Sequence, residues 1–240
     1  MDGVTGRSYT FNQIKELVRS FGSALVKRGF RKGDVLSIYL PNIPEYIIVF
    51  YGVLSVGGIV TTVNPTNTEG ELLYQLKDSG AKYLVTLPKL ADNAMSAAGK
   101  AGVNNVFVFG SIEKCESAWD LLKDDGNNFP THVRINIKED VCVLPYSSGT
   151  TGIPKGVMLT HYNLVAFITL SEAVRKAGTK YETASDLEAG LGLLPFYHAY
   201  GLLVSLGVYM IHGMMVIALP KFEPEMFLKY IQEYKVGDGV

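Results

Sequence analysis

The chain has 240 residues, of which 48% are hydrophobic, and its 22 basic and 23 acidic residues give a formal net charge of −1. A chain of this length and composition can bury the core of one large domain or of two small ones. The balanced charge excludes a protein that holds nucleic acid or an acidic membrane through bulk positive charge.

The first third of the chain alternates between helical and strand-like spacing of apolar residues. Thr10 and Gln13 form a capping-box pattern that starts a helix, and Gly29 and Gly33 end it. The elements predicted next are a strand at 35–40, a helix from the turn at 41–44 to about residue 54, a strand at 59–63, a helix at 69–78 and a strand at 83–86.

The alternation continues, with one interruption, through the rest of the chain. A helix at 88–98 and a strand at 106–109 precede an irregular stretch at 111–139. Strands separated by helices at this spacing predict βαβ crossovers, and therefore a layered α/β/α fold with a largely parallel sheet. The last predicted elements are a strand at 141–145, a helix at 162–176, a polar loop at 178–186, a strand at 191–194, a helix at 202–211, a strand at 214–219 and a helix at 223–234.

Two stretches without a charged residue, 46–63 and 189–220, are long enough to cross a bilayer. Glycines divide the first stretch, and Pro195 and further glycines divide the second, into helix-sized and strand-sized pieces. Buried α/β cores are built in this way. We therefore expect no transmembrane segment.

The segment Tyr146–Gly156, YSSGTTGIPKG, carries the clearest chemistry. It follows an apolar strand and combines four Ser/Thr hydroxyls, three glycines and one lysine. Glycine lets backbone N–H groups approach an anion, hydroxyls add donors, and lysine supplies a point charge that suits phosphate. The spacing is not the Walker pattern, because Gly149 is followed by Gly152 and Lys155 lies beyond Pro154. The segment is predicted to bind polyphosphate rather than to form a plain flexible turn.

This segment resembles the signature phosphate loop of the adenylate-forming (AMP-dependent synthetase/ligase) superfamily. Leu194–Gly201, LPFYHAYG, resembles the family motif that lines the acyl pocket. The resemblance extends to about residue 236 and is closest to the 4-coumarate–CoA ligases and luciferase-like acyl-CoA synthetases. Other stretches that stand as in this family are Gly33-Asp34, Leu40-Pro41-Asn42, Asn64-Pro65 and Pro220-Lys221-Phe222.

The resemblance implies that ATP activates a carboxylic acid as its acyl-adenylate. The loop would grip the β- and γ-phosphates, Thr151 would help to hold Mg²⁺, and the substrate carboxylate would attack the α-phosphorus. The acyl group would then pass to the thiol of coenzyme A. The implied catalytic residues are Lys155, Thr151 and His198. Those implied for phosphate binding are Ser147, Ser148, Gly149, Thr150, Thr151 and Lys155.

Residues of the second motif match the family's acyl pocket. His198 would border the acyl carbonyl and the path of the thiol, Tyr200 would pack beside the acyl group, and Gly201 completes the motif. Without the motif, a His and a Tyr in an apolar stretch would indicate only core packing. Lys221 matches a position that places a cation near a coenzyme A phosphate. A pocket serine of plant coumarate ligases would fall near Val204, so coumarate itself is not implied.

Several functional parts of the family are not found in residues 1–240. They are the motif that completes the adenine site, the acidic residue that grips ribose, the hinge, and the small C-terminal domain with its adenylation lysine. We therefore expect residues 1–240 to form a partial AMP-binding domain, a fragment or truncated form that turns over poorly alone. We also expect strand 214–219 to lie at an open sheet edge, because no further strand follows it.

Two other functions remain open. One is an amino-acid adenylation domain, although residues 197–200, YHAY, offer no acidic partner for a substrate ammonium group. The other is a non-catalytic, truncated nucleotide-binding form. The acid is predicted only by class, as a small-molecule carboxylic acid; medium-chain fatty, aryl and arylpropenoic acids all fit.

The cellular compartment of the protein is predicted from its first residues and its two cysteines. Residues 1–7 have no apolar core of a signal peptide, and Cys115 and Cys142 form no metal, redox or disulfide pattern. A reducing, intracellular compartment is expected, either the peroxisome or the cytoplasm.

Overall fold

The computed structural model of the chain describes residues 1–147, 152–178, 189–234 and 236. Its helices are α1 (Phe11–Lys27), α2 (Glu45–Ser55), α3 (Glu69–Asp78), α4 (Ala91–Ala101), α5 (Ala118–Leu121), α6 (His161–Gly178), α7 (Ala199–Leu203), α8 (Tyr209–Ile211) and α9 (Pro224–Tyr234). Its strands are β1 (Val35–Ile38), β2 (Ile59–Thr62), β3 (Ala81–Thr86), β4 (Asn105–Val108), β5 (Glu116–Ser117), β6 (Val141–Ser147), β7 (Lys155–Gly156), β8 (Leu159–Thr160), β9 (Ala189–Gly192) and β10 (Met215–Ala218).

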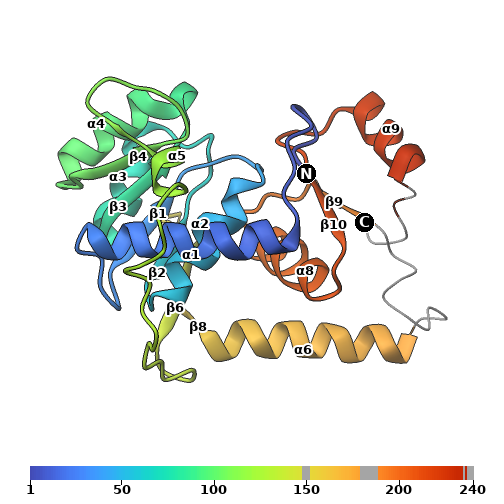
Figure 1. The fold of residues 1–240 in the computed structure, drawn as a ribbon. Helices are drawn as coiled ribbons and strands as arrows, with labels where there is room; N and C mark the ends of the chain where they lie inside the picture. The colour runs from blue at the N-terminus through green and yellow to red at the C-terminus, as the bar shows by residue number, and fades with distance from the viewer. Residues whose placement is uncertain (148–151, 179–188, 235, 237–240) are drawn as a thin grey trace.

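The described strands form one large sheet and one small sheet (Figure 1). In the large sheet the order is β5-β4-β3-β1-β2-β6-β7, and β8 also pairs with β6. Neighbours are parallel except for β7 and β8, which run antiparallel to β6. The small sheet joins β9 and β10 in parallel. The predicted largely parallel sheet is therefore confirmed.

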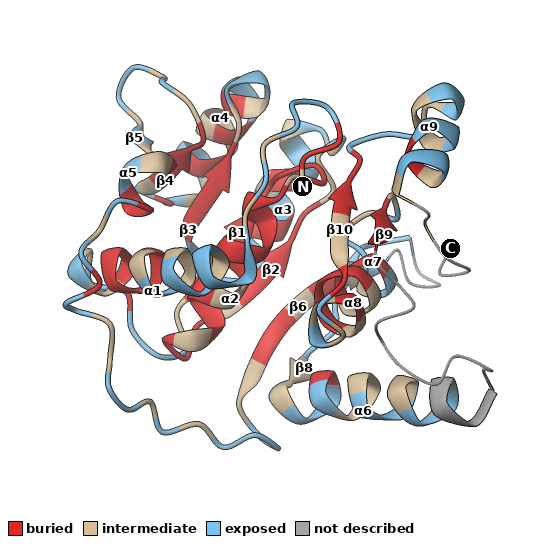
Figure 2. Cartoon of the chain, turned by 45° about the vertical axis from the view of Figure 1, so that its right-hand side comes forward, coloured by how far each residue is buried: buried red, intermediate tan, exposed pale blue. Residues whose placement is uncertain are grey.

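The large sheet lies between two layers of helices. Successive side chains on a strand point to opposite faces. Leu36 and Ile38 of β1 accordingly join the cluster that holds α1 and α2, whereas Val35 and Leu84 join the cluster that holds α3 and α4. Figure 2 shows the buried residues concentrated in the strands and in α2. The layered α/β/α arrangement predicted from the pattern is confirmed.

The helix starts follow from local chemistry. The Thr10 hydroxyl accepts from the Gln13 N–H at 3.2 Å while the Gln13 side chain accepts from the Thr10 N–H at 2.8 Å, which confirms the predicted capping box of α1. Thr68 and Glu71 form a second capping box at the start of α3. Such boxes satisfy the backbone donors that a helix leaves open at its first turn.

The small sheet corrects one expectation about its edge. Strand β10 pairs with β9 on one side, but its other side is not open, because residues 1–3 lie against it. The Gly3 N–H donates to the Ala218 carbonyl at 2.9 Å, and the Ala218 N–H donates to the Met1 carbonyl at 2.8 Å. The prediction failed because the spacing of apolar residues shows where a strand runs but not which distant segment pairs with it.

The two uncharged stretches become buried α/β elements, as expected. Residues 46–63 make most of α2 and β2, and residues 189–220 make β9, α7, a π-helical turn at Val204–Val208, α8 and β10. In the described part of the chain, no helix has the length and apolar character needed to cross a membrane. Most of the polar loop predicted at 178–186 lies outside the described residues.

Candidate functional site

The predicted phosphate segment begins at the carboxyl end of β6, the last strand in the parallel run of the large sheet. Ser147 is the last residue of β6, and Lys155 opens β7, which returns antiparallel with Ser147 opposite Lys155 and Tyr146 opposite Gly156. The segment is thus a hairpin beyond a strand end, the position expected from the sequence and the one where open α/β sheets bind ligands. Ser148, Gly149, Thr150 and Thr151 lie outside the described residues, so their predicted phosphate contacts and the Mg²⁺ role of Thr151 stay predictions.

Helix α3 holds this hairpin through two tyrosine hydroxyls. Tyr74 donates to the Pro154 carbonyl at 3.0 Å, and Tyr146 donates to Asp78 Oδ2 at 2.5 Å. Burial and the neighbouring Asp78 carboxylate raise the pKa of Tyr146, so its hydroxyl remains a donor. A Cβ on Gly156 would lie 3.1 Å from the Tyr146 ring, so the residue opposite the ring needs to be small.

Two buried polar side chains from the large sheet hold the segment before His198. Asn42, just after β1, donates from Nδ2 to the carbonyls of Gly192 and Leu194, both at 2.9 Å, and its Oδ1 accepts from the Phe196 N–H at 2.8 Å. Thr62, at the end of β2, donates to the Tyr197 carbonyl at 2.7 Å. The loop between β9 and α7 is therefore fixed to the strand ends of the large sheet.

His198 itself caps α7. Its Nδ1 accepts a long hydrogen bond, 3.4 Å, from the Tyr200 N–H. A neutral histidine whose Nδ1 accepts carries its proton on Nε2, so Nε2 can donate. Gly201 is buried in the first turn of α7, where a Cβ would overlap the Pro195 carbonyl oxygen. Helix α7 starts three residues before the predicted helix at 202–211, because this cap and this close approach let it form there.

A cavity of about 410 Å³ lies between the hairpin and the His198 segment. It brings together Ser147 and His198, which belong to two motifs and lie 51 positions apart in the chain. Its described lining combines polar side chains, such as Asn64 and Ser147, with apolar ones, such as Val157 and Leu159. Its described lining consists of Thr62, Asn64, Asn67, Glu71, Tyr74, Gln75, Pro145, Tyr146, Ser147, Pro154, Val157, Leu159, Tyr197, His198 and Ala199.

The other predicted residues lie around this cavity or away from it. Lys155 is exposed and forms no ion pair with any described residue, so its ammonium is available to an anionic ligand. Tyr200 is 55% exposed and does not line the cavity. Lys221 is also outside the lining and pairs with Glu223 at 2.5 Å. Within the described residues, no cluster of three His, Cys, Asp or Glu side chains could hold a metal ion.

Sequence reasoning missed the residues that support the site. Asn42 and Thr62 could have been suspected, because polar residues at the carboxyl ends of parallel strands meet at one edge of the sheet. Tyr74 and Tyr146 gave no comparable signal. A tyrosine in a helix or at a strand end is ordinary, and only the fold brings these two hydroxyls to the hairpin.

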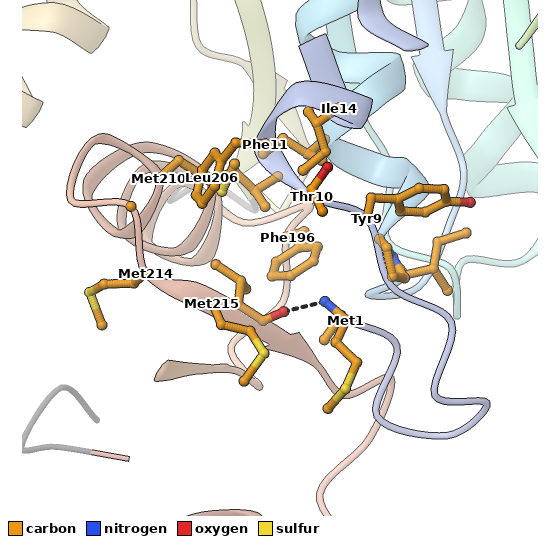
Figure 3. Close-up of a pocket in the computed structure, with 16 residues that line it drawn as sticks. Met1, Tyr9, Thr10, Phe11, Ile14, Phe196, Leu206, Met210, Met214 and Met215 are labelled. Carbon is orange, nitrogen blue, oxygen red and sulfur yellow. Dashed lines mark hydrogen bonds between the residues drawn. The ribbon is translucent and has the colours of Figure 1, made fainter. Parts of the chain in front are cut away.

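A second cavity, of about 350 Å³, lies between α1, α2, α8 and β10 (Figure 3). Phe11, Phe196, Met210 and Met214 are among the side chains that surround it, and the Met1 amino group donates to the Val216 carbonyl at 2.6 Å. Its lining is mostly apolar and contains no lysine or arginine among the described residues. It contains neither Ser147 nor His198, the two motif residues that line the other cavity.

Comparison with known proteins adds to this geometry. A family model described as AMP-binding enzyme matches residues 2–237. A probable 4-coumarate–CoA ligase from Dictyostelium discoideum is 33% identical over 261 residues, covering 99% of this chain and 45% of the relative. The structure of a long-chain-fatty-acid–CoA ligase from Archaeoglobus fulgidus matches with a TM-score of 0.84 at 29% identity, over 97% of this chain and 44% of that one.

The structure of ATP-bound MatB from Rhodopseudomonas palustris matches with a TM-score of 0.75 at 26% identity, over 91% of this chain and 42% of that one. The chain thus spans less than half the length of the relatives it matches. The family model, in contrast, covers almost all of the chain. The chain therefore belongs to the AMP-binding enzymes, the adenylate-forming superfamily.

Proposed function

We propose that this chain is the nucleotide- and acyl-binding part of an acid–thiol ligase, which forms an acyl-adenylate from ATP and a carboxylic acid and then a thioester with coenzyme A. The activity is proposed for a protein continued to the length of the relatives. The observation that carries the proposal is that Ser147 of the phosphate hairpin (residues 146–156) and His198 of the acyl motif line the same cavity.

Adenylation would occur by in-line attack of a carboxylate oxygen on the α-phosphorus, with pyrophosphate as the leaving group. Lys155 and the hairpin hydroxyls, Ser147 among them, would hold the β- and γ-phosphates and oppose the charge that builds on pyrophosphate. A bound Mg²⁺, held with the help of Thr151, would neutralise part of that charge. Positioning and electrostatics supply most of the rate enhancement in such a reaction.

Thioester formation would follow at the same cavity. The thiolate sulfur of coenzyme A attacks the acyl carbonyl carbon, and AMP leaves with the oxygen that came from the carboxylate. His198, whose Nε2 can donate, would border this carbonyl. Lys221 would bind a coenzyme A phosphate in place of its ion-pair partner Glu223. Lys221 does not line the cavity.

The class of acid follows from the cavity only in outline. Val157, Leu159 and Ala199 contribute apolar surface to it, which suits the body of a medium-chain fatty, aryl or arylpropenoic acid. The names of the matched proteins include a coumarate ligase and a long-chain-fatty-acid ligase at similar identity, so they do not select among these acids. A reaction that consumes ATP and coenzyme A supports an intracellular location, in the peroxisome or the cytoplasm.

The proposal is tested by carboxylate-dependent pyrophosphate release from MgATP, with hexanoate, benzoate and coumarate as separate substrates. Release that requires one of these acids and is lost in Lys155→Ala supports it. Lys15→Ala, which removes an exposed lysine of α1, is the matched control and should behave as the parent protein. Release that is independent of every acid, or that is equal in the two variants, would contradict it.

A further inference from the structure

The side-chain amide of Asn42 has its hydrogen-bonding capacity filled by one short loop. Asn42 is 5% exposed, and Nδ2 donates to the carbonyls of Gly192 and Leu194, with Leu193 at a longer 3.3 Å. On the other side of the amide, Oδ1 accepts from the Phe196 N–H at 2.8 Å. Such an arrangement distinguishes asparagine from aspartate, because a carboxylate has no donor to offer the carbonyls.

Thr62 anchors the next residue of the same loop. Its hydroxyl, on a side chain 2% exposed, donates to the Tyr197 carbonyl at 2.7 Å. Thr62 also pairs in register with Pro145 of β6, the strand that ends at Ser147. One residue therefore connects the strand of the phosphate hairpin to the peptide unit that joins Tyr197 to His198.

Packing also fixes Phe196, the loop residue that lies beside the contacts made by Asn42 and Thr62. The Phe196 ring is 1% exposed and meets the Tyr46 ring edge-on, with centroids 5.7 Å apart. A Cβ on Gly192 would lie 2.8 Å from the Phe196 ring, so the ring fills the space that this glycine leaves. His198 lies two residues further on and caps α7, so its place depends on anchors that come from the other sheet.

We propose that Asn42 and Thr62 are positioning residues that set His198 relative to the phosphate hairpin. The consequence for catalysis rests on the proposed function, in which His198 borders the acyl carbonyl. A misplacement of about 1 Å at a reacting centre can reduce a rate about a hundredfold. Loss of the Thr62 hydroxyl should therefore slow thioester formation while the KM for ATP stays the same, because the phosphate hairpin keeps its own contacts to α3.

The test reads the state of His198 directly, so it does not depend on turnover. The ring nitrogens of His198 are observed by long-range ¹H–¹⁵N NMR on the 240-residue chain, with His198→Gln used for assignment. Thr62→Val removes the hydroxyl at nearly constant shape, and Thr62→Ser restores it. Thr86→Val is the matched control, because Thr86 is equally buried and donates to the Tyr39 carbonyl at 3.1 Å in a part of the sheet away from His198.

In the parent chain the neutral form of the ring should carry its proton on Nε2, because Nδ1 accepts from the Tyr200 N–H. Thr62→Val should shift or broaden the His198 signals, whereas Thr62→Ser and Thr86→Val should leave them as in the parent. Unchanged signals in Thr62→Val, or an equal disturbance in Thr86→Val, would overturn the proposal. An absence of pyrophosphate release would count against the proposed function only.

Asn42 is tested in the parent chain as well as in a variant, because Asn42→Asp can fail to fold. In the parent, the side-chain amide protons of Asn42 should exchange with solvent at least about a hundredfold more slowly than those of a free asparagine. In a folded Asn42→Asp, the His198 signals should move as they do in Thr62→Val. Free exchange of the parent Asn42 amide, or an unmoved His198 in a folded variant, would contradict its role.

Discussion

Replacement of Gly201 by alanine should destabilise the protein by forcing α7 away from the loop before it. The added Cβ would overlap the Pro195 carbonyl oxygen and lie 2.7 Å from the Leu194 carbonyl oxygen. Both are backbone atoms. The Leu194 carbonyl accepts from Asn42 and the Pro195 carbonyl accepts from the His198 N–H at 3.0 Å, so moving either atom strains a hydrogen bond. Helix α7 would have to move by about 1 Å to restore ordinary contact distances.

The size of the effect follows from two opposing contributions. Overpacking a tight interior site costs about 1 to 3 kcal/mol. Alanine in a helix recovers about 0.5 to 1 kcal/mol relative to glycine. Because the overlap is with backbone, its cost should lie in the upper part of that range, at about 2 to 3 kcal/mol, and the net loss in the free energy of unfolding should be about 1 to 2.5 kcal/mol. Because His198 caps the same helix, the displacement should also move the imidazole and slow any reaction that needs it.

Gly99→Ala provides the matched control within the same chain. Gly99 lies in α4 and is exposed, and a Cβ there would meet no atom within 4 Å. This variant should gain about 0.5 to 1 kcal/mol from helix propensity alone. Urea unfolding followed by circular dichroism measures both changes. A Gly201→Ala protein as stable as the parent, alongside a stabilised Gly99→Ala, would refute the packing assigned to α7.

Three further predictions concern charge and burial. Lys155→Ala should slow carboxylate-dependent pyrophosphate release about a hundred- to thousandfold with the KM for the acid unchanged; an unchanged rate would remove Lys155 from the site. Burial raises the pKa of the Cys142 thiol to about 12, so the unfolded chain loses this proton first and stability should fall as pH rises above about 9. The slope from this thiol is about 1.4 kcal/mol per pH unit up to about pH 12, and Cys142→Val should remove it in urea unfolding measured at pH 8 to 10.5. Glu45→Gln should lower the free energy of unfolding by about 1 to 3 kcal/mol in the same assay. The buried Glu45 carboxylate accepts from Arg7 at 2.7 and 3.0 Å and from the Tyr9 hydroxyl at 2.6 Å. An unchanged free energy of unfolding would show that this network is not a net stabiliser.

The order of helices and strands was predictable because it depends on local spacing. The helix at 69–78 and the capping box at Thr10 and Gln13 correspond to α3 and the start of α1. The predicted start of helix α7 lay three residues after its actual start, because the cap by His198 and the fit of Gly201 depend on the tertiary fold. The pairing of residues 1–3 with β10 joins segments more than 200 positions apart, and no local pattern encodes it.

Two candidate site residues could be named from the sequence because each belongs to a motif. Ser147 and His198 were identified from two separate segments, and the fold places both at one cavity. Their supports were not identified. Asn42 and Thr62 act through hydrogen bonds to a loop that lies 135 or more positions away in the chain, and such contacts exist only once the two sheets have met.

The central claim is that a carboxylate oxygen attacks the α-phosphorus of ATP at the cavity between Ser147 and His198. It is tested most directly with a carboxylic acid labelled with ¹⁸O in both oxygens, incubated with MgATP, coenzyme A and the protein continued to the length of its relatives. The account predicts that one ¹⁸O per turnover appears in AMP and none in pyrophosphate, and that Lys155→Ala slows the appearance of labelled AMP about a hundred- to thousandfold. Label in pyrophosphate or inorganic phosphate, or AMP that forms without label, would contradict it.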